Sequence, residues 1–348
     1  MSRRALTLLV AGFLTVILAV AAAWLPVPYV VLNPGPTENT IGEVKGKPVI
    51  SISDHATYPT EGKLSMVTVA YQGGPGNAID LITALRGWLD SSIAVVPEET
   101  IFPRTSTPKE IEQQNSLDMT TSQEAATIAA LHALKIPVPE VVSVVAVEKG
   151  LPADGKLQLG DEVTAVNGTA VSNQNAVAEA VRKAKPGDQV RLTVNRKDAP
   201  VDVTLGTVAG DDGKARVGVT MGMRYKPPFK VDISVGDIGG PSAGLMFSLG
   251  IYDKLTPGAL TGGKSIAGTG TISVDGAVGP IGGIEQKMAG ARKAGATIFL
   301  TPARNCAQAL RAAPEGLRLV KVETLDGAIK AIDALRTGTG DVPACTGN

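Results

Sequence analysis

Histidine, cysteine and aromatic residues are scarce in this chain of 348 residues, which limits the kinds of catalytic site, metal site and fold that the chain can form. The two histidines, His55 and His132, are isolated and far apart, so the sequence supports neither a Ser-His-Asp site nor a metal site. The formal net charge is zero, which gives no indication of a nucleic-acid partner. Aromatic residues make up 3%, while glycine and proline number 40 and 23, a composition typical of small-residue β structure with many turns.

The N-terminus has no charged residue between Arg4 and Glu38. Residues 5–25 are apolar or small throughout, and as a helix they would cross a hydrocarbon core of roughly 30 Å. Arg3 and Arg4 predict that this end stays inside, which makes a single-pass protein of the cell membrane with the bulk of the chain extracytoplasmic. The run Ala21-Ala22-Ala23 also resembles a signal-peptidase site, so a cleaved signal peptide is the alternative reading of residues 1–32.

Only two cysteines occur, Cys306 and Cys345, both near the C-terminus. In an oxidising compartment such a pair most simply forms one structural disulfide, here one that would hold the tail at 341–348. Two unpaired thiols are the alternative.

Residues 33–125 read as a linker followed by an α/β segment. The stretch 33–62 is rich in Pro, Gly, Thr and Ser, which favours a linker with short strands. Alternation and β-branching predict a strand over 63–71, and apolar spacing predicts helices over 76–90 and 120–135.

Residues 258–265 read "GALTGGKS", which matches the spacing of a phosphate-binding P-loop. Such a loop needs a buried strand before it and a helix after it, so that backbone N–H groups hold the phosphates. Here a helical pattern precedes the stretch and glycines with β-branched residues follow it. We therefore expect no bound nucleotide, no other cofactor, and Lys264 in a loop.

The stretch "LPADGKLQLGDEVTAVNG" and the helix that follows it resemble a PDZ domain of the bacterial protease-associated type, which we place at 126–207. Asn167-Gly168 makes a hairpin turn in this pattern. The resemblance implies binding of chain termini by strand addition to a sheet edge. The glycine-containing loop that holds a terminus in such domains does not appear in "LKIPVPEVVS".

A serine and a lysine in the C-terminal third have suggestive surroundings. Pro241 suits a first helical position, so we expect Ser242 at a helix start with free backbone N–H groups around it. Lys287 falls in the opening turn of a second helix. Burial among Ile281, Ile284 and Met288, and the positive helix end, would lower its pKa and leave a neutral amine as a base.

The stretch "GGPSAGL", followed in order by "AGTGTISVDGAVGPIGGIEQKMAGARKAGA", resembles the proteolytic domain of Lon proteases, here assigned to 208–340. The resemblance implies that Ser242 is the nucleophile, that Lys287 is the general base, and that Thr269 places its hydroxyl near the lysine amine. The family's acidic residue three positions before the serine is Gly239 here, and Asp237 is not its equivalent. Gly239, Gly240 and Ala243 are expected to supply oxyanion contacts or room for the substrate backbone.

The sequence thus predicts an α+β protein with an N-terminal transmembrane helix, a PDZ domain and a C-terminal Lon-type α/β domain. That order is similar to YlbL-type secreted or membrane-anchored proteases. It implies an ATP-independent serine endopeptidase, because no Lon ATPase portion appears in the sequence, with envelope proteins or peptides as substrates. The alternative is a non-catalytic anchored scaffold whose PDZ domain binds protein tails. Homo-oligomerisation stays open.

Overall fold

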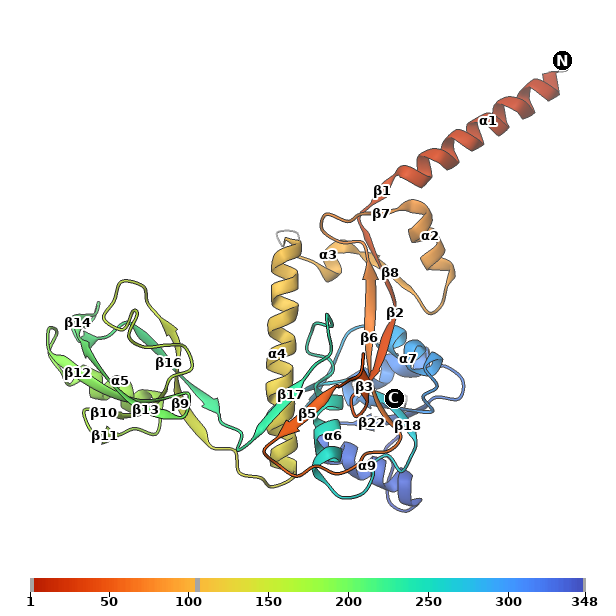
Figure 1. Ribbon diagram of the computed structural model, residues 1–348. Coiled ribbons are helices and arrows are strands. Elements are labelled where there is room, and N and C mark those ends of the chain that lie inside the picture. Colours follow the sequence, from red (N-terminus) through yellow and green to blue (C-terminus); the bar gives the residue numbers. More distant parts are fainter. Residues whose placement is uncertain (1–2, 104–106, 347–348) are drawn as a thin grey trace. The chain divides into compact units, whose positions relative to one another are not determined.

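The computed structural model describes residues 3–103 and 107–346 and divides into two compact units (Figure 1). The first unit combines Met1–Ile136 with Phe229–Asn348, and the second is Pro137–Pro228, inserted between them. Both units mix helices and strands, which confirms the predicted α+β class. Residues 1–2 of the predicted anchor and 347–348 of the predicted tail lie outside the described residues.

A six-stranded mixed sheet in the order β22-β21-β18-β6-β2-β8 forms the centre of the first unit. Strands β6, β18, β21 and β22 run parallel, whereas β2 is antiparallel to both β6 and β8. The parallel strands are largely buried and rich in Ile, Leu, Val and Phe, as expected for strands covered on both faces. The strand bounds are Tyr29–Asn39 (β2), Lys63–Gln72 (β6), Ala94–Pro97 (β8), Ser265–Gly268 (β18), Ile298–Pro302 (β21) and Arg318–Val322 (β22).

Helices pack against this sheet, and α7 contacts β2 and β6 while α6 contacts β6, α4 and α9 (Figure 1). Their bounds are Arg3–Trp24 (α1), Leu81–Leu89 (α2), Glu98–Ile101 (α3), Pro108–Ala133 (α4), Gly244–Leu255 (α6), Ile284–Lys293 (α7), Cys306–Arg311 (α8) and Leu325–Thr337 (α9), with a 3-10 turn at Ala303–Asn305. The short strands are Pro26–Val27 (β1), Glu43–Val44 (β3), Lys47–Pro48 (β4), Ile50–Ser53 (β5), Ile79–Asp80 (β7), Lys230–Ile233 (β17), Thr271–Ile272 (β19) and Val278–Gly279 (β20).

The stretch 33–62, expected as a linker, belongs to the first unit instead. β2 supplies a full strand of the central sheet, and β5 pairs with β17 from the other half of the unit. The prolines at 34 and 36 coincide with a register shift between β2 and β6, which lets the strand tolerate two residues without N–H donors. The prediction of a linker, which was based on composition, is therefore wrong for this segment.

The second unit is a sheet in the order β13-β12-β10-β9-β16, with β11 paired to β10. One helix, α5 (Gln174–Arg182), buries Val177 and Val181 against it. The unit begins and ends later than the PDZ range proposed from the sequence, because 126–133 continue α4 and β16 pairs with β9. Its strands are Glu140–Val147 (β9), Glu162–Val166 (β10), Thr169–Ala170 (β11), Gln189–Arg196 (β12), Ala199–Gly206 (β13), Val208–Ala209 (β14), Ala215–Arg216 (β15) and Val219–Tyr225 (β16).

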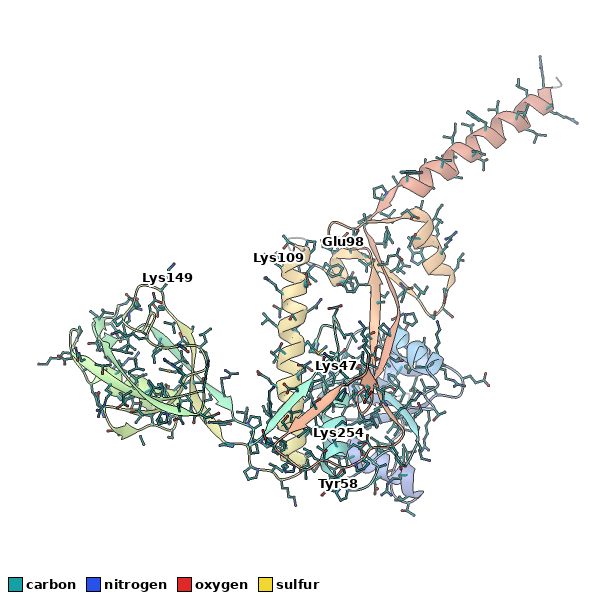
Figure 2. All side chains as sticks on the ribbon, viewed as in Figure 1. Lys47, Tyr58, Glu98, Lys109, Lys149 and Lys254 are labelled. Carbon is teal, nitrogen blue, oxygen red and sulfur yellow. A yellow bond between two sulfur atoms is a disulfide. The ribbon has the colours of Figure 1, made fainter. Side chains whose placement is uncertain are left out.

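The N-terminal helix α1 is long and apolar enough over Arg3–Ala22 to cross a membrane, judged by length and composition. None of this span is buried, and Figure 2 shows its side chains projecting into open space. A core helix of a soluble protein would be mostly buried, so α1 fits either an anchor or a signal sequence.

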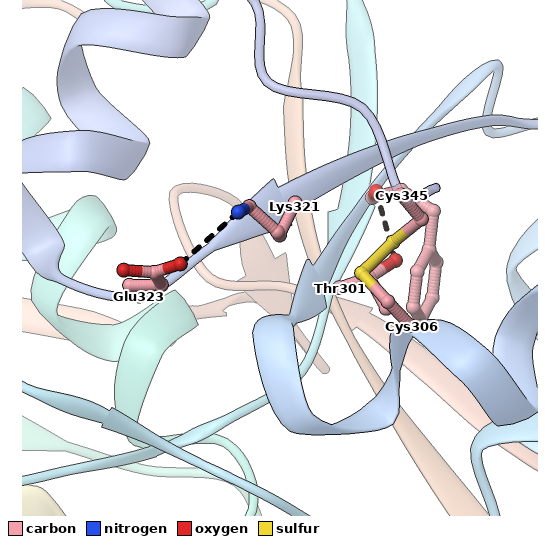
Figure 3. Close-up of a disulfide and its surroundings, with 6 residues drawn as sticks. Thr301, Cys306, Lys321, Glu323 and Cys345 are labelled. Carbon is pink, nitrogen blue, oxygen red and sulfur yellow. Dashed lines mark hydrogen bonds and ion pairs between the residues drawn. A yellow bond between two sulfur atoms is a disulfide. The ribbon is translucent and has the colours of Figure 1, made fainter. Parts of the chain in front are cut away.

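A disulfide joins Cys306, at the start of α8, to Cys345 in the tail (Figure 3). Both cysteines lie in a buried cluster with Phe299 and Leu319. The tail is also held by backbone contacts to β22, where the Lys321 N–H donates to the Pro343 carbonyl at 2.8 Å. The bridge therefore fixes a tail that already lies along the sheet edge.

Replacing both cysteines with serine should lower stability by roughly 2–4 kcal/mol, since the bridge closes a loop of 39 residues. Peptide cleavage per folded molecule should be retained, because neither cysteine lines the cleft that holds the residues proposed below to react. Hydrogen exchange should show faster opening of 341–346 and α8 than of α6 and α7. Equal loosening of all these elements would contradict a role confined to the tail.

Candidate active site

Ser242 lies in a turn directly before α6, and hydrogen bonds from the β18 end hold that turn. The Ser242 carbonyl accepts from the N–H of Gly270 at 2.9 Å and from Oγ1 of Thr269 at 3.0 Å. Because these donors occupy the carbonyl, it does not start the helical ladder, and α6 begins at Gly244. The prediction that Pro241 opens the helix is therefore wrong, and Ser242 projects from a turn.

Lys287 is the fourth residue of α7 and only 3% exposed. The helix starts after Gly283, which has a left-handed φ of +67° that favours glycine. There is also no space for a side chain at this position, because a Cβ would lie 2.7 Å from Val69. Ile284 and Met288 on the same helix are fully buried. Burial lowers the pKa of Lys287 from its usual 10.5 to about 8, in the direction expected from the sequence.

The structure brings Ser242, Thr269 and Lys287 together although they lie on three different elements. Nζ of Lys287 is 2.6 Å from Oγ of Ser242, 3.2 Å from Oγ1 of Thr269 and 3.3 Å from the Val67 carbonyl oxygen of β6. A neutral amine has two hydrogens and one lone pair. The Val67 carbonyl can only accept, and the Thr269 hydroxyl already donates to the Ser242 carbonyl, so both take a hydrogen from Nζ. The lone pair is thus left facing the Ser242 hydroxyl.

Ser242 and Lys287 border a cleft of about 1010 Å³, and Thr269 lies buried behind them. Residues of β6 from Val67 to Tyr71 line one part of the cleft, and residues of α4 and of the loop at 233–243 line another. Two contacts attach α4 to the serine turn: Oγ of Ser122 donates to the Pro241 carbonyl at 3.0 Å, and the Gly240 N–H donates to the Asn115 carbonyl at 2.9 Å. The polar segment before 120 is therefore a wall of the site, which the sequence did not indicate.

The two glycines before Ser242, Gly239 and Gly240, differ in the space that lies beside them. A Cβ on Gly239 would lie 2.8 Å from Asn115 of α4, so this position must stay small. Gly240 has a left-handed φ of +87° with open space beside it, so backbone can approach it closely. Its N–H already donates to Asn115. Among the described residues, the N–H groups of Ser242 and Ala243 have no backbone acceptor, which leaves them as candidate oxyanion donors.

The remaining predicted residues are placed as follows. Asp237 is exposed and lines the cleft, as does Glu112 of α4, so the charged lining apart from Lys287 is acidic. Neither histidine lines the cleft within the described residues: the His55 ring stacks on Phe229 at 4.3 Å, and Nδ1 of His132 contacts the Val274 carbonyl.

The second unit contains a feature missed in the sequence. β16 has β9 as its partner on one side and stands last in the sheet order, so its other edge is unpaired in the described sheet, and α5 contacts it. It follows a turn at Gly218, whose φ is +77° and whose Cβ would lie 2.3 Å from Leu151. A glycine turn, an edge strand and a helix are the parts from which PDZ domains build a terminus-binding groove. The signal was "ARVGVTMG" at 215–222, in a region assigned to the next domain.

Family models match a part of each of the two structural units. A family model of the Lon protease (S16) C-terminal proteolytic domain matches residues 230–333. This part of the chain is a Lon-type proteolytic domain. A PDZ domain model matches residues 114–207, which overlaps most of the second unit and most of α4. The α4 portion nevertheless packs with the Lon-type domain.

The chain is 32% identical over 118 residues to Lon protease 2 of Bacillus subtilis, covering 32% of this chain and 20% of that protein. It is 34% identical over 132 residues to the Lon protease of Phenylobacterium zucineum, covering 36% and 16%. The chain thus spans about a fifth or less of these curated relatives. A crystal structure of the PDZ domain of an SdrC-like protein from Listeria innocua matches with 22% identity and a TM-score of 0.22, over 23% of this chain and 92% of that one.

Proposed function

We propose that this protein is a serine endopeptidase in which Ser242 and Lys287 form the catalytic dyad. The observation that carries the proposal is the position of Nζ, which lies 2.6 Å from Oγ of Ser242 and within 3.3 Å of the Val67 carbonyl and the Thr269 hydroxyl. In the neutral amine these two acceptors take the hydrogens, and the lone pair is left for the Ser242 proton. A buried, partly neutral lysine aimed at a serine is costly as a purely structural feature, since burial disfavours its charged form.

The proposed reaction begins when Nζ of Lys287 takes the proton of the Ser242 hydroxyl as Oγ attacks the substrate carbonyl carbon. The N–H groups of Ser242 and Ala243 then stabilise the negative oxygen of the tetrahedral intermediate. Protonated Nζ returns its proton to the leaving amine when the C–N bond breaks, which leaves an acyl group on Oγ. Water, deprotonated by the same amine, hydrolyses this ester and regenerates the serine.

Extended peptide segments fit the cleft best, because it is long, open along β6 and bordered by glycines at Ser242. Glu112 and Asp237 add negative charge to the lining. We expect flexible or partly unfolded segments of envelope proteins as substrates. The β16 edge in the PDZ unit is a second recognition site for chain termini in this proposal.

We further propose that the protein acts without ATP, outside the cytoplasm, and anchored by α1. The stretch 258–265 supports the first point, since it runs from α6 into β18 and so has a helix before it and a strand after it. Arg3 and Arg4 before the apolar span support the orientation. The disulfide fits an oxidising compartment.

An electrophilic serine-directed probe such as a fluorophosphonate distinguishes this enzyme from a non-catalytic scaffold. The probe should modify the peptide containing Ser242, and Ser242→Ala should abolish labelling. Ser234→Ala is the matched control, because Ser234 is exposed in the same cleft and, among the described residues, its hydroxyl makes no hydrogen bond to a lysine or histidine. Labelling that is absent in the folded wild type, or that persists in Ser242→Ala, would favour the scaffold.

A further inference from the structure

Helix α2 presents apolar side chains on two faces, and protein covers only one of them. Its inner face is formed by the buried small residues Ala84 and Gly87, and a Cβ on Gly87 would lie 2.5 Å from Val95. Its outer face is formed by Leu85, Trp88 and Leu89, which are 47%, 53% and 89% exposed. Their i, i+3, i+4 spacing places them on one stripe. Within the described residues this stripe is covered only in part, by the ring of Tyr29 against Trp88.

The backbone places this stripe beside the point where the chain leaves α1. β1 follows α1 directly and pairs with β7, with Pro26 opposite Asp80 (Figure 1). Asp80 is the N-cap of α2 and accepts from the Thr83 N–H at 2.7 Å. Paired strands lie about 5 Å apart and a helix of nine residues is about 13 Å long, so all of α2 stays close to the end of α1.

The exit of α1 is itself apolar, since Trp24 and Leu25 are both exposed. Beyond the hydrocarbon core, each interfacial layer of a bilayer is roughly 5–8 Å thick, and tryptophan is enriched in this layer. Trp88 is held at the outer face by an edge-on contact with Tyr29, with ring centroids 5.6 Å apart. Both tryptophans of the chain therefore lie close to the point where an anchored α1 would leave the bilayer.

We propose that α2 docks on the lipid bilayer, with Leu85, Trp88 and Leu89 in the interfacial layer. The inference rests on the proposed anchoring by α1. Docking removes an apolar stripe from water and gives the Lon-type domain a second point of attachment, so the domain is oriented on the membrane. The cleft-lining segment 73–77 immediately precedes β7 and α2, so one end of the cleft lies near the lipid surface. Substrate segments close to the membrane would then be favoured.

The two tryptophans make the test direct. The full chain carrying Trp24→Phe, reconstituted in phosphatidylcholine–phosphatidylglycerol vesicles, leaves Trp88 as its only tryptophan. We expect blue-shifted Trp88 emission, loss of acrylamide quenching, and strong quenching by lipids brominated near the headgroup. Adding Leu85→Ser and Leu89→Ser should reverse all three signals. Leu159→Ser, which alters an exposed leucine of the PDZ unit, should leave them unchanged.

Red-shifted Trp88 emission that acrylamide quenches as in water would overturn the proposal. A blue shift that brominated lipids do not quench, and that grows with protein concentration, would also overturn it by showing that a second copy covers the stripe. The variant Trp88→Phe separates this failure from failure of the anchor, because Trp24 then reports α1 alone. Peptidase activity is measured separately, so the dyad proposal is unaffected by either outcome.

Discussion

Replacing Lys287 with arginine is expected to lower kcat/KM for a peptide substrate by roughly 10³-fold or more, the order of effect of removing a general base. Guanidinium keeps the positive charge but stays protonated, so it has no lone pair for the Ser242 proton. Ser242→Ala should cause a similar loss because it removes the attacking oxygen. The double variant should be little worse than either, since the two groups act in one step.

The larger arginine head could disturb the buried site, so Lys287→Met serves as the second variant, with similar length and no charge. Lys293→Arg on the exposed end of α7 is the matched control and should keep full activity. Circular dichroism and thermal melting establish that each variant is folded. Substantial turnover by a folded Lys287→Arg or Lys287→Met protein would refute the dyad.

The second large effect expected is on the pH dependence of cleavage. Lys287 acts only as a neutral amine, and burial lowers its pKa to about 8. With this lowered pKa, the neutral amine is the minor form of Lys287 below pH 8 and the major form above it. The value of kcat/KM should therefore rise about tenfold per pH unit from pH 6 and level off above about pH 8. The gain between pH 6 and pH 8 is then on the order of 50-fold.

This profile is measured with an uncharged peptide substrate, so that substrate ionisation does not contribute, and with folding monitored at each pH. A rate independent of pH between 6 and 9 would exclude Lys287 as the titrating base. A rate that falls as pH rises through 8 would point to a protonated lysine as the active form. Either result is distinguishable from unfolding, which the control measurement detects.

Local patterns were sufficient for several elements of the protein. Alternation over 63–71 predicted β6, which spans Lys63–Gln72, and the motif order around Ser242 and Lys287 predicted a Lon-type domain. Prediction was weaker where one residue's conformation depends on a distant partner. The start of α6 is an example, because the Ser242 carbonyl is taken by donors from 269–270.

The boundaries of the PDZ unit also depend on a partner that is distant in the sequence. β9 and β16 pair with Val142 opposite Met223, across most of the unit, and neither strand signals this partner in its own sequence. The glycine turn before β16 was therefore assigned to the Lon-type domain that follows. Likewise the polar helix α4 has no strong apolar stripe, and only its contacts at Asn115 and Ser122 identify it as a cleft wall.

The sequence by itself determined the apolar N-terminal span, the pairing candidates Cys306 and Cys345, and the types of residue available for chemistry, because these depend on composition and short-range order. Only the tertiary structure decided how Nζ of Lys287 divides its hydrogen bonds, since the Val67 carbonyl that takes one hydrogen lies on β6, far away in the chain. It also decided that Leu85, Trp88 and Leu89 stay largely exposed to solvent beside the end of α1. Both outcomes come from non-local strand pairing, in which β6 joins β18 and β1 joins β7, and such pairings are set by packing across the whole unit and not by any local pattern.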